Sequence, residues 1–282
     1  MSPPRADLHL HTHYSDGTFT PEEVVRRARS AGLAAISLTD HDTLKGLEPA
    51  RRAAGSDPSA GSGQALEIIT GVELTAIFGD RELHVLGYGF RPDDLPLQSY
   101  LARAQGGRRE RIQAMIDQLR EHGVEVSLEE VDAAAGDADS IGRPHLAEVL
   151  VRKGAVRSLP EAFERYLGDR APCFVHKATL TVQQAAALLR TAGGIAVLAH
   201  PHRLIQQSWI PELVEQGIQG IEVYHPDHNA AVAQHYRQLA EERGLLITGG
   251  SDCHGLRKAG GPTLGTVSVP YPCVERLKAL FS

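Results

Sequence analysis

The sequence predicts an α/β protein in which strands and helices alternate, with one helical segment interrupting the alternation. Short apolar runs such as 34–38 and 195–199 are separated by amphipathic stretches with helix caps, as in parallel β/α units. Polar residues, many of them histidines, directly follow these runs. The carboxyl ends of the strands in a parallel β/α barrel converge on one face, where active sites are built. We therefore expect a β/α barrel with a polar site on that face.

Seven apolar or alternating runs predict the strands of this barrel. They begin near residues 6, 34, 66, 82, 195, 220 and 245. The runs 66–74 and 82–90 flank the turn Gly79-Asp80 and are expected to form a hairpin. A short further strand is predicted at 265–269.

Helix signals separate the strands. The clearest is a capping box formed by Thr20 and Glu23, with Pro21 at the first helical position and Gly32 as the stop. Further helices are expected at 44–54, at 181–192, near 211, at 230–243 and from about 273.

The middle of the chain, residues 101–171, shows helix signals and no convincing strand. Ser127 and Glu130 form a second capping box, and Pro144 suits the start of another helix. The stretch 55–64 is rich in Gly and Ser and is expected to be a surface loop. The expected domains are the first part of the barrel at 1–100, a small helical domain at 101–171 and the second part of the barrel at 172–282.

The composition argues against several classes of protein. The chain has 282 residues and a net charge of −6, which disfavours nonspecific binding along duplex DNA. No run of 18 apolar residues is present, so no membrane span is expected, and without an apolar signal segment we expect a cytoplasmic location. Three cysteines are too few for a disulfide framework, whereas 14 histidines favour a metal site.

The residues that follow the strands include side chains that bind transition metals. His9 and His11 alternate along the first strand and project from one face, where two imidazoles can ligate one ion. Each residue alone has an ordinary explanation: His41 can cap a helix, His200 can be a core histidine, and Asp252 can be a turn residue. Their recurrence at equivalent strand ends favours a common site. The set at strand ends is His9, His11, His41, Glu73, His200, Asp252 and His254.

These motifs resemble those of the PHP family (polymerase and histidinol phosphatase). The matching residues are His9-x-His11 with Asp16, Thr39-Asp40-His41, Glu73, His84, Ala199-His200-Pro201 and Ser251-Asp252-x-His254. The resemblance implies a distorted (β/α)7 TIM-like barrel that holds two or three divalent metal ions, for which His and carboxylate ligands suit Mn, Fe or Zn. By this resemblance the first ion is bound by His9, His11, Glu73 and Asp252, the second by Glu73, His84 and His200, and the third by Asp16, His41 and His254.

The segment 141–147 narrows the resemblance to the small bacterial PHP phosphoesterases. These enzymes act on nucleoside 3′,5′-bisphosphates, and related members degrade short 5′-phosphorylated RNA from its 5′ end. We therefore expect a metal-dependent phosphoesterase whose substrate is a small phosphorylated nucleotide or a short RNA. The sequence indicates no oligomeric state.

Three alternatives stay open. A histidinol-phosphate phosphatase has a similar length. A metal-dependent amidohydrolase shares the barrel and the His-x-His start, but it commonly needs a bridging carboxylated lysine where this chain has Glu73. A non-catalytic metal-binding module would tolerate missing ligands, and none is missing here.

Further residues are expected to contact the substrate or move protons. The guanidinium of Arg143, at a predicted helix start, suits the second phosphate of a bisphosphate, and the alternative is a surface arginine paired with an acid such as Asp139. His202 is expected to contact phosphate or to protonate the leaving oxygen, beside Asp252 as the catalytic carboxylate. Lys177 is a weaker candidate for phosphate binding. The ordinary alternatives are a loop histidine at 202 and a solvated lysine at 177.

Three residues near the ligands are expected to have other roles. Asp40 is expected to orient a ligand histidine without binding metal itself. His225 ends a strand and is a candidate for the wall of the pocket. Cys253 is interpreted as a spacer between two ligands and not as a nucleophile.

Overall fold

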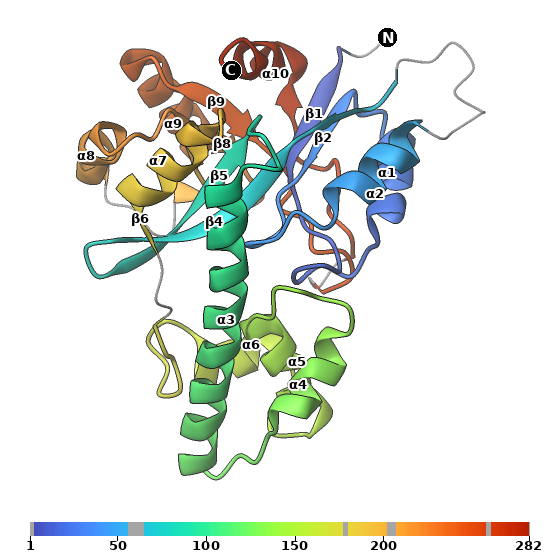
Figure 1. Ribbon diagram of the computed structural model, residues 1–282, viewed down its shortest axis with the longest axis vertical. Helices are drawn as coiled ribbons and strands as arrows, with labels where there is room; N and C mark the ends of the chain where they lie inside the picture. The colour runs from blue at the N-terminus through green and yellow to red at the C-terminus, as the bar shows by residue number, and fades with distance from the viewer. Residues whose placement is uncertain (1–2, 56–64, 177–179, 202–206, 258–260, 282) are drawn as a thin grey trace.

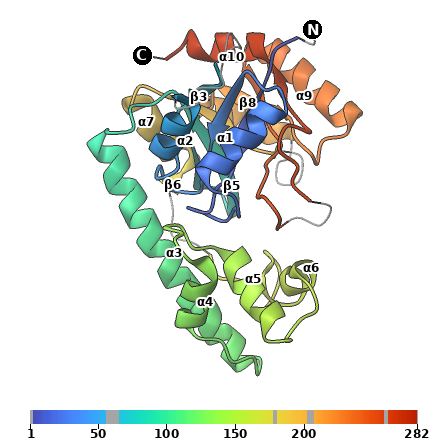
Figure 2. The same cartoon turned by 90° about the vertical axis from the view of Figure 1, so that its right-hand side faces the viewer.

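The computed structural model describes residues 3–55, 65–176, 180–201, 207–257 and 261–281. Strands with their covering helices form one part of the molecule, and a group of helices extends from it along the long helix α3, Leu95–Glu121 (Figure 1, Figure 2). The predicted α/β class is confirmed. In the part of the chain that is described, no helix has the length and apolar character needed to cross a membrane.

The strands form two sheets. The first, in the order β10-β1-β2-β3, comprises β1 (Arg5–Leu10), β2 (Ala35–Leu38), β3 (Glu67–Ile69) and β10 (Val269–Pro270). The second, in the order β6-β4-β5-β7-β8-β9, comprises β4 (Gly71–Phe78), β5 (Arg81–Tyr88), β6 (Leu180–Thr181), β7 (Ile195–Leu198), β8 (Gly220–Tyr224) and β9 (Leu246–Gly249). Most neighbours are parallel, and the predicted hairpin is confirmed as the antiparallel pair β4–β5.

The two sheets meet without a continuous ladder between them. Isolated parallel bridges link Leu10 to Cys253 and His41 to Glu73. Over the described residues the strands therefore do not close into one sheet, and the predicted seven-stranded barrel is not confirmed as a closed structure.

The prediction of a single strand at 66–74 is wrong, because this stretch contains β3 and the start of β4. β3 pairs with β2 in the first sheet, whereas β4 pairs with β5 in the second. The chain changes sheets at Gly71, where a Cβ atom would lie 2.1 Å from Oγ of Ser37, so only glycine fits. As a result Glu73 is the third residue of β4 and does not lie at the end of a strand.

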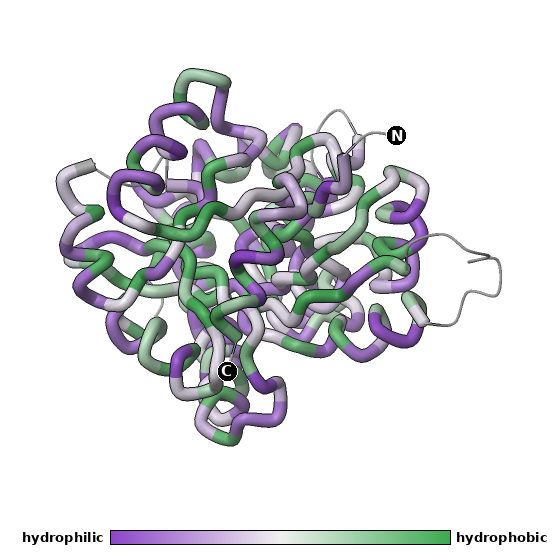
Figure 3. The backbone as a smooth tube through the Cα atoms, turned by 90° about the horizontal axis from the view of Figure 1, so that it is seen from above, coloured by the Kyte–Doolittle hydropathy of each residue, from purple (hydrophilic) through white to green (hydrophobic). Residues whose placement is uncertain are grey.

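Helices cover the sheets. They are α1 (Pro21–Ser30), α2 (Leu47–Gly55), α7 (Val182–Thr191), α8 (Ile210–Glu215), α9 (Ala230–Arg243) and α10 (Tyr271–Lys278). Both predicted capping boxes are confirmed: Oγ1 of Thr20 accepts from the amide of Glu23 at 3.2 Å, and Oγ of Ser127 accepts from that of Glu130 at 3.3 Å. Viewed from above, the peripheral helices alternate hydrophilic and hydrophobic stretches, as expected of helices with one packed face (Figure 3).

The middle of the chain is helical, as predicted. α3 begins at Leu95, earlier than the predicted residue 101, because the side chain of Asp94 caps its first turn. It is followed by α4 (Leu128–Ala135), α5 (Arg143–Arg152), α6 (Leu159–Ala162) and a π-helical turn (Phe163–Leu167). Buried side chains of these helices, such as Met115 and Leu150, form a hydrophobic cluster of their own.

Candidate metal centre

The end of β1 brings two histidines into the interior. The side chains of His9 and His11 are 0% and 1% exposed. Their Nε2 atoms lie 3.4 and 3.3 Å from the same oxygen, Oδ1 of Asp252, which follows β9. The alternation along the strand thus turns both rings toward one point, where the loop after β9 meets the end of β1.

Glu73 lies among five histidines, and its two carboxylate oxygens face different ones. Oε1 is 2.7 Å from Nδ1 of His84 and 3.1 Å from Nε2 of His200. The nitrogens that face Oε2 are Nε2 of His9 (3.2 Å), Nε2 of His11 (3.1 Å) and Nδ1 of His41 (3.3 Å). A carboxylate placed in this way can bind two ions at once, one through each oxygen.

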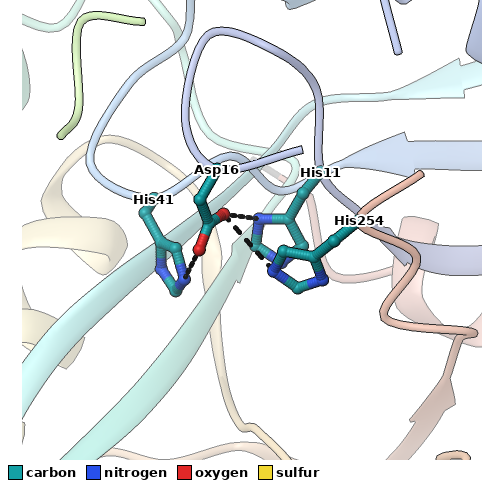
Figure 4. Close-up of side chains that lie close together, drawn as sticks. All are labelled: His11, Asp16, His41 and His254. Atoms are coloured by element: carbon teal, nitrogen blue, oxygen red, sulfur yellow. Dashed lines mark ion pairs between the residues drawn. The ribbon is translucent and has the colours of Figure 1, made fainter. Parts of the chain in front are cut away.

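A second carboxylate, Asp16, gathers its own group of histidines (Figure 4). Oδ1 of Asp16 lies 3.3 Å from Nε2 of His254 and 3.6 Å from Nδ1 of His11, and Oδ2 lies 3.8 Å from Nε2 of His41. His11 and His41 each turn one ring nitrogen to Asp16 and the other to Glu73. The two carboxylate groups are therefore parts of one continuous cluster.

The hydrogen bonds of the rings leave metal-binding nitrogens aimed into the cluster. Nδ1 of His9 donates to Oε1 of Glu222 at 2.9 Å, and Nδ1 of His254 donates to the carbonyl of Asp252 at 2.9 Å. In a neutral imidazole this leaves the Nε2 lone pair facing the carboxylates, which is the arrangement of a ligand histidine held by an outer partner.

Several ring nitrogens have no hydrogen bond although carboxylate oxygens are close. Nε2 of His11, Nδ1 of His41 and Nδ1 of His84 are buried and make none with the described residues, yet each lies within 3.3 Å of Glu73. Unpaired buried polar atoms are rare and costly. Histidine and carboxylate donors that gather within 4.8 Å of one another suit divalent transition metals, so the residues present fit such ions.

The charges of the cluster compensate one another. Burial alone would lower the pKa of His11, but contacts with Asp252 and Glu73 outweigh it and raise the pKa to about 10. Burial alone would raise the pKa values of Asp16, Glu73 and Asp252, but the surrounding histidines hold them well below the usual range. Without metal the carboxylates therefore keep a proton on His11, and a bound cation would take the place of that proton.

Backbone strain is concentrated at the cluster. The non-glycine residues with positive φ in the described ranges are Asp42 (52°), His200 (26°) and Asp252 (47°). Such conformations persist only where the surroundings fix them, and they gather at functional sites. All three residues lie in the cluster or beside a member of it.

Two buried carboxylates that the sequence reasoning missed support the cluster. Glu222, in β8, binds Nδ1 of His9 and also accepts the amide of His200 at 2.7 Å through Oε2. Asp7 accepts the hydroxyl of Ser251 at 2.6 Å and so holds the loop that carries Asp252. The visible signal for Glu222 was a charged residue inside the apolar run 220–224.

Asp40 and His225 have more specific roles than predicted. Asp40 contacts the ligand loop through Ser15 (2.6 Å) and Thr12 (2.7 Å), and no direct bond to a ligand histidine is found among the described residues. His225 accepts the amide of Asp227 at Nδ1, and its Nε2 lies 3.4 Å from Oδ2 of Asp252. His225 thus faces the centre itself and not only the wall of a pocket.

A hollow of about 110 Å³ lies between the cluster and the helical segment. Its lining includes Asp16, His41 and His84 from the cluster, and Arg108 and Arg143 from the helices. The hollow therefore joins the candidate metal ligands to positively charged side chains.

The structure places Arg143 in this hollow but with a partner other than the expected one. Its Nη1 lies 2.6 Å from Oδ1 of Asp169, whereas Asp139 pairs with Lys45. At the start of α5 the ring of His145 accepts the amide of Gly142 at 3.0 Å, so this amide is not available to a ligand. Lys177 and His202 lie outside the described residues.

Comparison with known proteins agrees with this site. The PHP domain model matches residues 7–113. The chain is 31% identical over 272 residues to the 3′,5′-nucleoside bisphosphate phosphatase of Chromobacterium violaceum, covering 95% of this chain and 93% of that protein. It is 31% identical over 253 residues to the 5′-3′ exoribonuclease Rnm of Escherichia coli, covering 88% of this chain and 84% of that protein.

A solved structure of a similar protein also points to a phosphoesterase. A candidate metal-dependent phosphoesterase from Bifidobacterium adolescentis matches with a TM-score of 0.87 at 28% identity, over 100% of this chain and 98% of that one. Together with the His, Asp and Glu cluster, these comparisons define a metal-dependent phosphoesterase. The chain belongs to the PHP family.

Proposed function

We propose that this enzyme removes the 3′-phosphate of nucleoside 3′,5′-bisphosphates and cleaves short 5′-phosphorylated RNA from its 5′ end. The observation that carries the proposal is the hollow that Arg143 shares with the candidate ligands Asp16, His41 and His84. Both substrates have a second phosphate beyond the one that is cleaved. A guanidinium set apart from the metal cluster can read that second phosphate.

The proposed ligands follow the two faces of Glu73. His9, His11 and Asp252 would hold one ion with Oε2, and His84 and His200 would hold a second with Oε1. The third set is Asp16, His41 and His254. Divalent ions, when bound, supply positive charge for phosphate and lower the pKa of water. Mn, Fe and Zn all suit these ligands.

The side chains around the ions would position the reactants. Asp252 faces His9 and His11 with one oxygen and His225 with the other, and it is proposed to orient the attacking water. Arg143 would bind the second phosphate in competition with Asp169. His202 and Lys177 keep their proposed roles of proton donor and phosphate contact.

The architecture suggested by the sequence also remains a proposal. The bridges Leu10–Cys253 and His41–Glu73 support the view that the two sheets are halves of one distorted barrel. The separate hydrophobic cluster of α3 to α6 supports a small helical domain between the two parts of that barrel.

The test compares Arg143→Ala on two matched substrates. The variant should lose about 1.5–3 kcal/mol of transition-state stabilisation on a nucleoside 3′,5′-bisphosphate, the scale of a hydrogen bond to a charged group. On the 3′-monophosphate, which lacks the second phosphate, it should lose almost nothing. The measurement is kcat/KM on both substrates with manganese-loaded enzyme.

The matched control is Arg109→Ala, because Arg109 is an exposed arginine that pairs with Asp132 away from the hollow. It should behave as the wild type on both substrates. Equal losses on the two substrates for Arg143→Ala would place this arginine at the cleaved phosphate or in the scaffold. No cleavage of either substrate by the wild type would overturn the proposed function.

A further inference from the structure

Arg108 is a buried cation with no role in the function proposed above. It lies on α3, its side chain is 9% exposed, and its Nε donates to Oδ2 of Asp42 at 2.6 Å. Asp42 is itself 0% exposed. A buried ion pair of this kind is costly to desolvate, so it is weak evidence for a contribution to stability.

The ion pair fixes a strained loop next to a candidate ligand. Asp42 follows His41 directly, and its φ of 52° lies in the left-handed region that disfavours most side chains. α3 holds this residue twice, because Nε2 of Gln105 also donates to its carbonyl at 2.9 Å. Two side chains of one helix thus hold the backbone beside His41 in its unusual conformation.

The same guanidinium reaches the strand that carries Glu73. Nη2 of Arg108 donates to Oγ1 of Thr75 at 3.2 Å. Thr75 is two residues beyond Glu73 in β4, on the same face of the strand, and is paired with His84 in β5. Arg108 therefore contacts one residue adjacent to His41 and another that shares a strand with Glu73 and pairs with His84.

We propose that Arg108 is a positioning residue for the metal centre. Through Asp42 and Thr75 it sets the loop of His41 against β4, so the helical segment helps to determine how tightly the centre binds metal. This inference rests on the proposed metal site. Partners that orient metal ligands typically contribute 10- to 100-fold in affinity.

The experiment is a calorimetric titration of the metal-free protein with Mn²⁺. Arg108→Met should lower the affinity of the ions that involve His41 by about 10- to 100-fold. Arg108→Lys keeps the charge and can make one of the two contacts but not both. Its loss of metal affinity should therefore be smaller than that of Arg108→Met. Asp42→Asn keeps a side-chain oxygen that can accept from Arg108, and asparagine tolerates positive φ. This variant should therefore bind metal nearly as the wild type does.

Arg111→Met is the control of matched burial on the same helix. Arg111 pairs with Glu82, which the β4–β5 ladder already holds in place. Among the described residues Arg111 makes no hydrogen bond or ion pair with the loop of His41. Its replacement should lower the melting temperature but leave the Mn²⁺ affinity within about threefold of the wild type, a smaller change than loss of an outer-shell partner.

A double variant, Asp42→Asn with Arg108→Met, separates positioning from the penalty of an unpaired buried charge. It carries the test even if Arg108→Met does not fold, because no buried charge is left without its partner. The proposal predicts that the double variant binds Mn²⁺ as weakly as Arg108→Met. Wild-type affinity in either variant would overturn it, as would a raised KM with unchanged affinity for metal. A wild-type protein that takes up no metal would overturn the proposed function as well.

Discussion

Replacing Glu73 with glutamine tests whether one side chain serves two ions. The change is nearly isosteric, but it exchanges one carboxylate oxygen for an amide nitrogen, which is a donor and not a metal ligand. Oε1 of Glu73 faces His84 and His200, and Oε2 faces His9 and His11. Glutamine can therefore serve one of these groups but not both.

The magnitude follows from this division. A tetrahedral structural metal site contributes about 10–16 kcal/mol, or roughly 3 kcal/mol for each of four ligands. Because only one oxygen is lost, Glu73→Gln should weaken one ion by about 3 kcal/mol, which is on the order of 100-fold in affinity. The ion on the other side should bind almost as before.

The assay is metal stoichiometry at a fixed free Mn²⁺ concentration, together with phosphatase activity. Glu73→Gln should retain about one equivalent less than the wild type and lose most activity, since both proposed ions would serve the same reaction. Glu222→Gln keeps an acceptor for either His9 or the amide of His200, so its loss in affinity should be about tenfold. Glu67→Gln, whose partners are Tyr271 and Lys278, should bind metal as the wild type does.

The refuting result is specific. If Glu73→Gln retained the full stoichiometry and lost no more affinity than Glu222→Gln, Glu73 would be a supporting residue and not a bridging ligand. An equal loss of every ion would also contradict the division of its oxygens between two groups.

Two further predictions concern protons and stability. Because the pKa of His11 is raised to about 10 in the metal-free protein, metal binding at pH 8 should release at least one proton per chain, and metal affinity should fall as the pH falls. Calorimetry in two buffers of different ionisation enthalpy measures the proton release. A measurement of no release would contradict the prediction. The stability that charged His11 gives the metal-free protein should be complete below pH 6.5 and lost as the pH rises through about 10. Ser251→Ala removes the donor to buried Asp7 and should lower the free energy of unfolding by about 1.5–3 kcal/mol in urea titrations, whereas a loss under about 0.5 kcal/mol would show that the bond is not needed.

Features set by neighbouring residues could be predicted from the sequence. The capping boxes at Thr20 and Ser127 depend on residues three positions apart, and the shared face of His9 and His11 depends on the period of a strand. The break at Gly71 was missed because apolar residues lie on both sides of it and no Pro or Gly-rich turn signal interrupts the run. The side chain of Ser37, from a neighbouring strand, is what requires glycine at this position.

The supporting residues of the site were harder to predict, because their partners are distant in the sequence. Glu222 binds a ring 213 positions away, and the partner of Arg108 lies 66 positions earlier. For Arg143 the alternative named Asp139, which is close in sequence, whereas the acid that pairs with it is Asp169, 26 positions away. A single sequence shows which side chains can form such pairs but not which ones meet.

The order of the proposed ligands along the chain has a consequence for biosynthesis. They begin at His9 and end at His254, and they come from the ends and interiors of both sheets. A nascent chain that has not yet presented Asp252 and His254 lacks a ligand for the first ion and another for the third. The complete centre can therefore assemble only once the segment that carries Asp252 and His254 has been synthesised and can fold against β1.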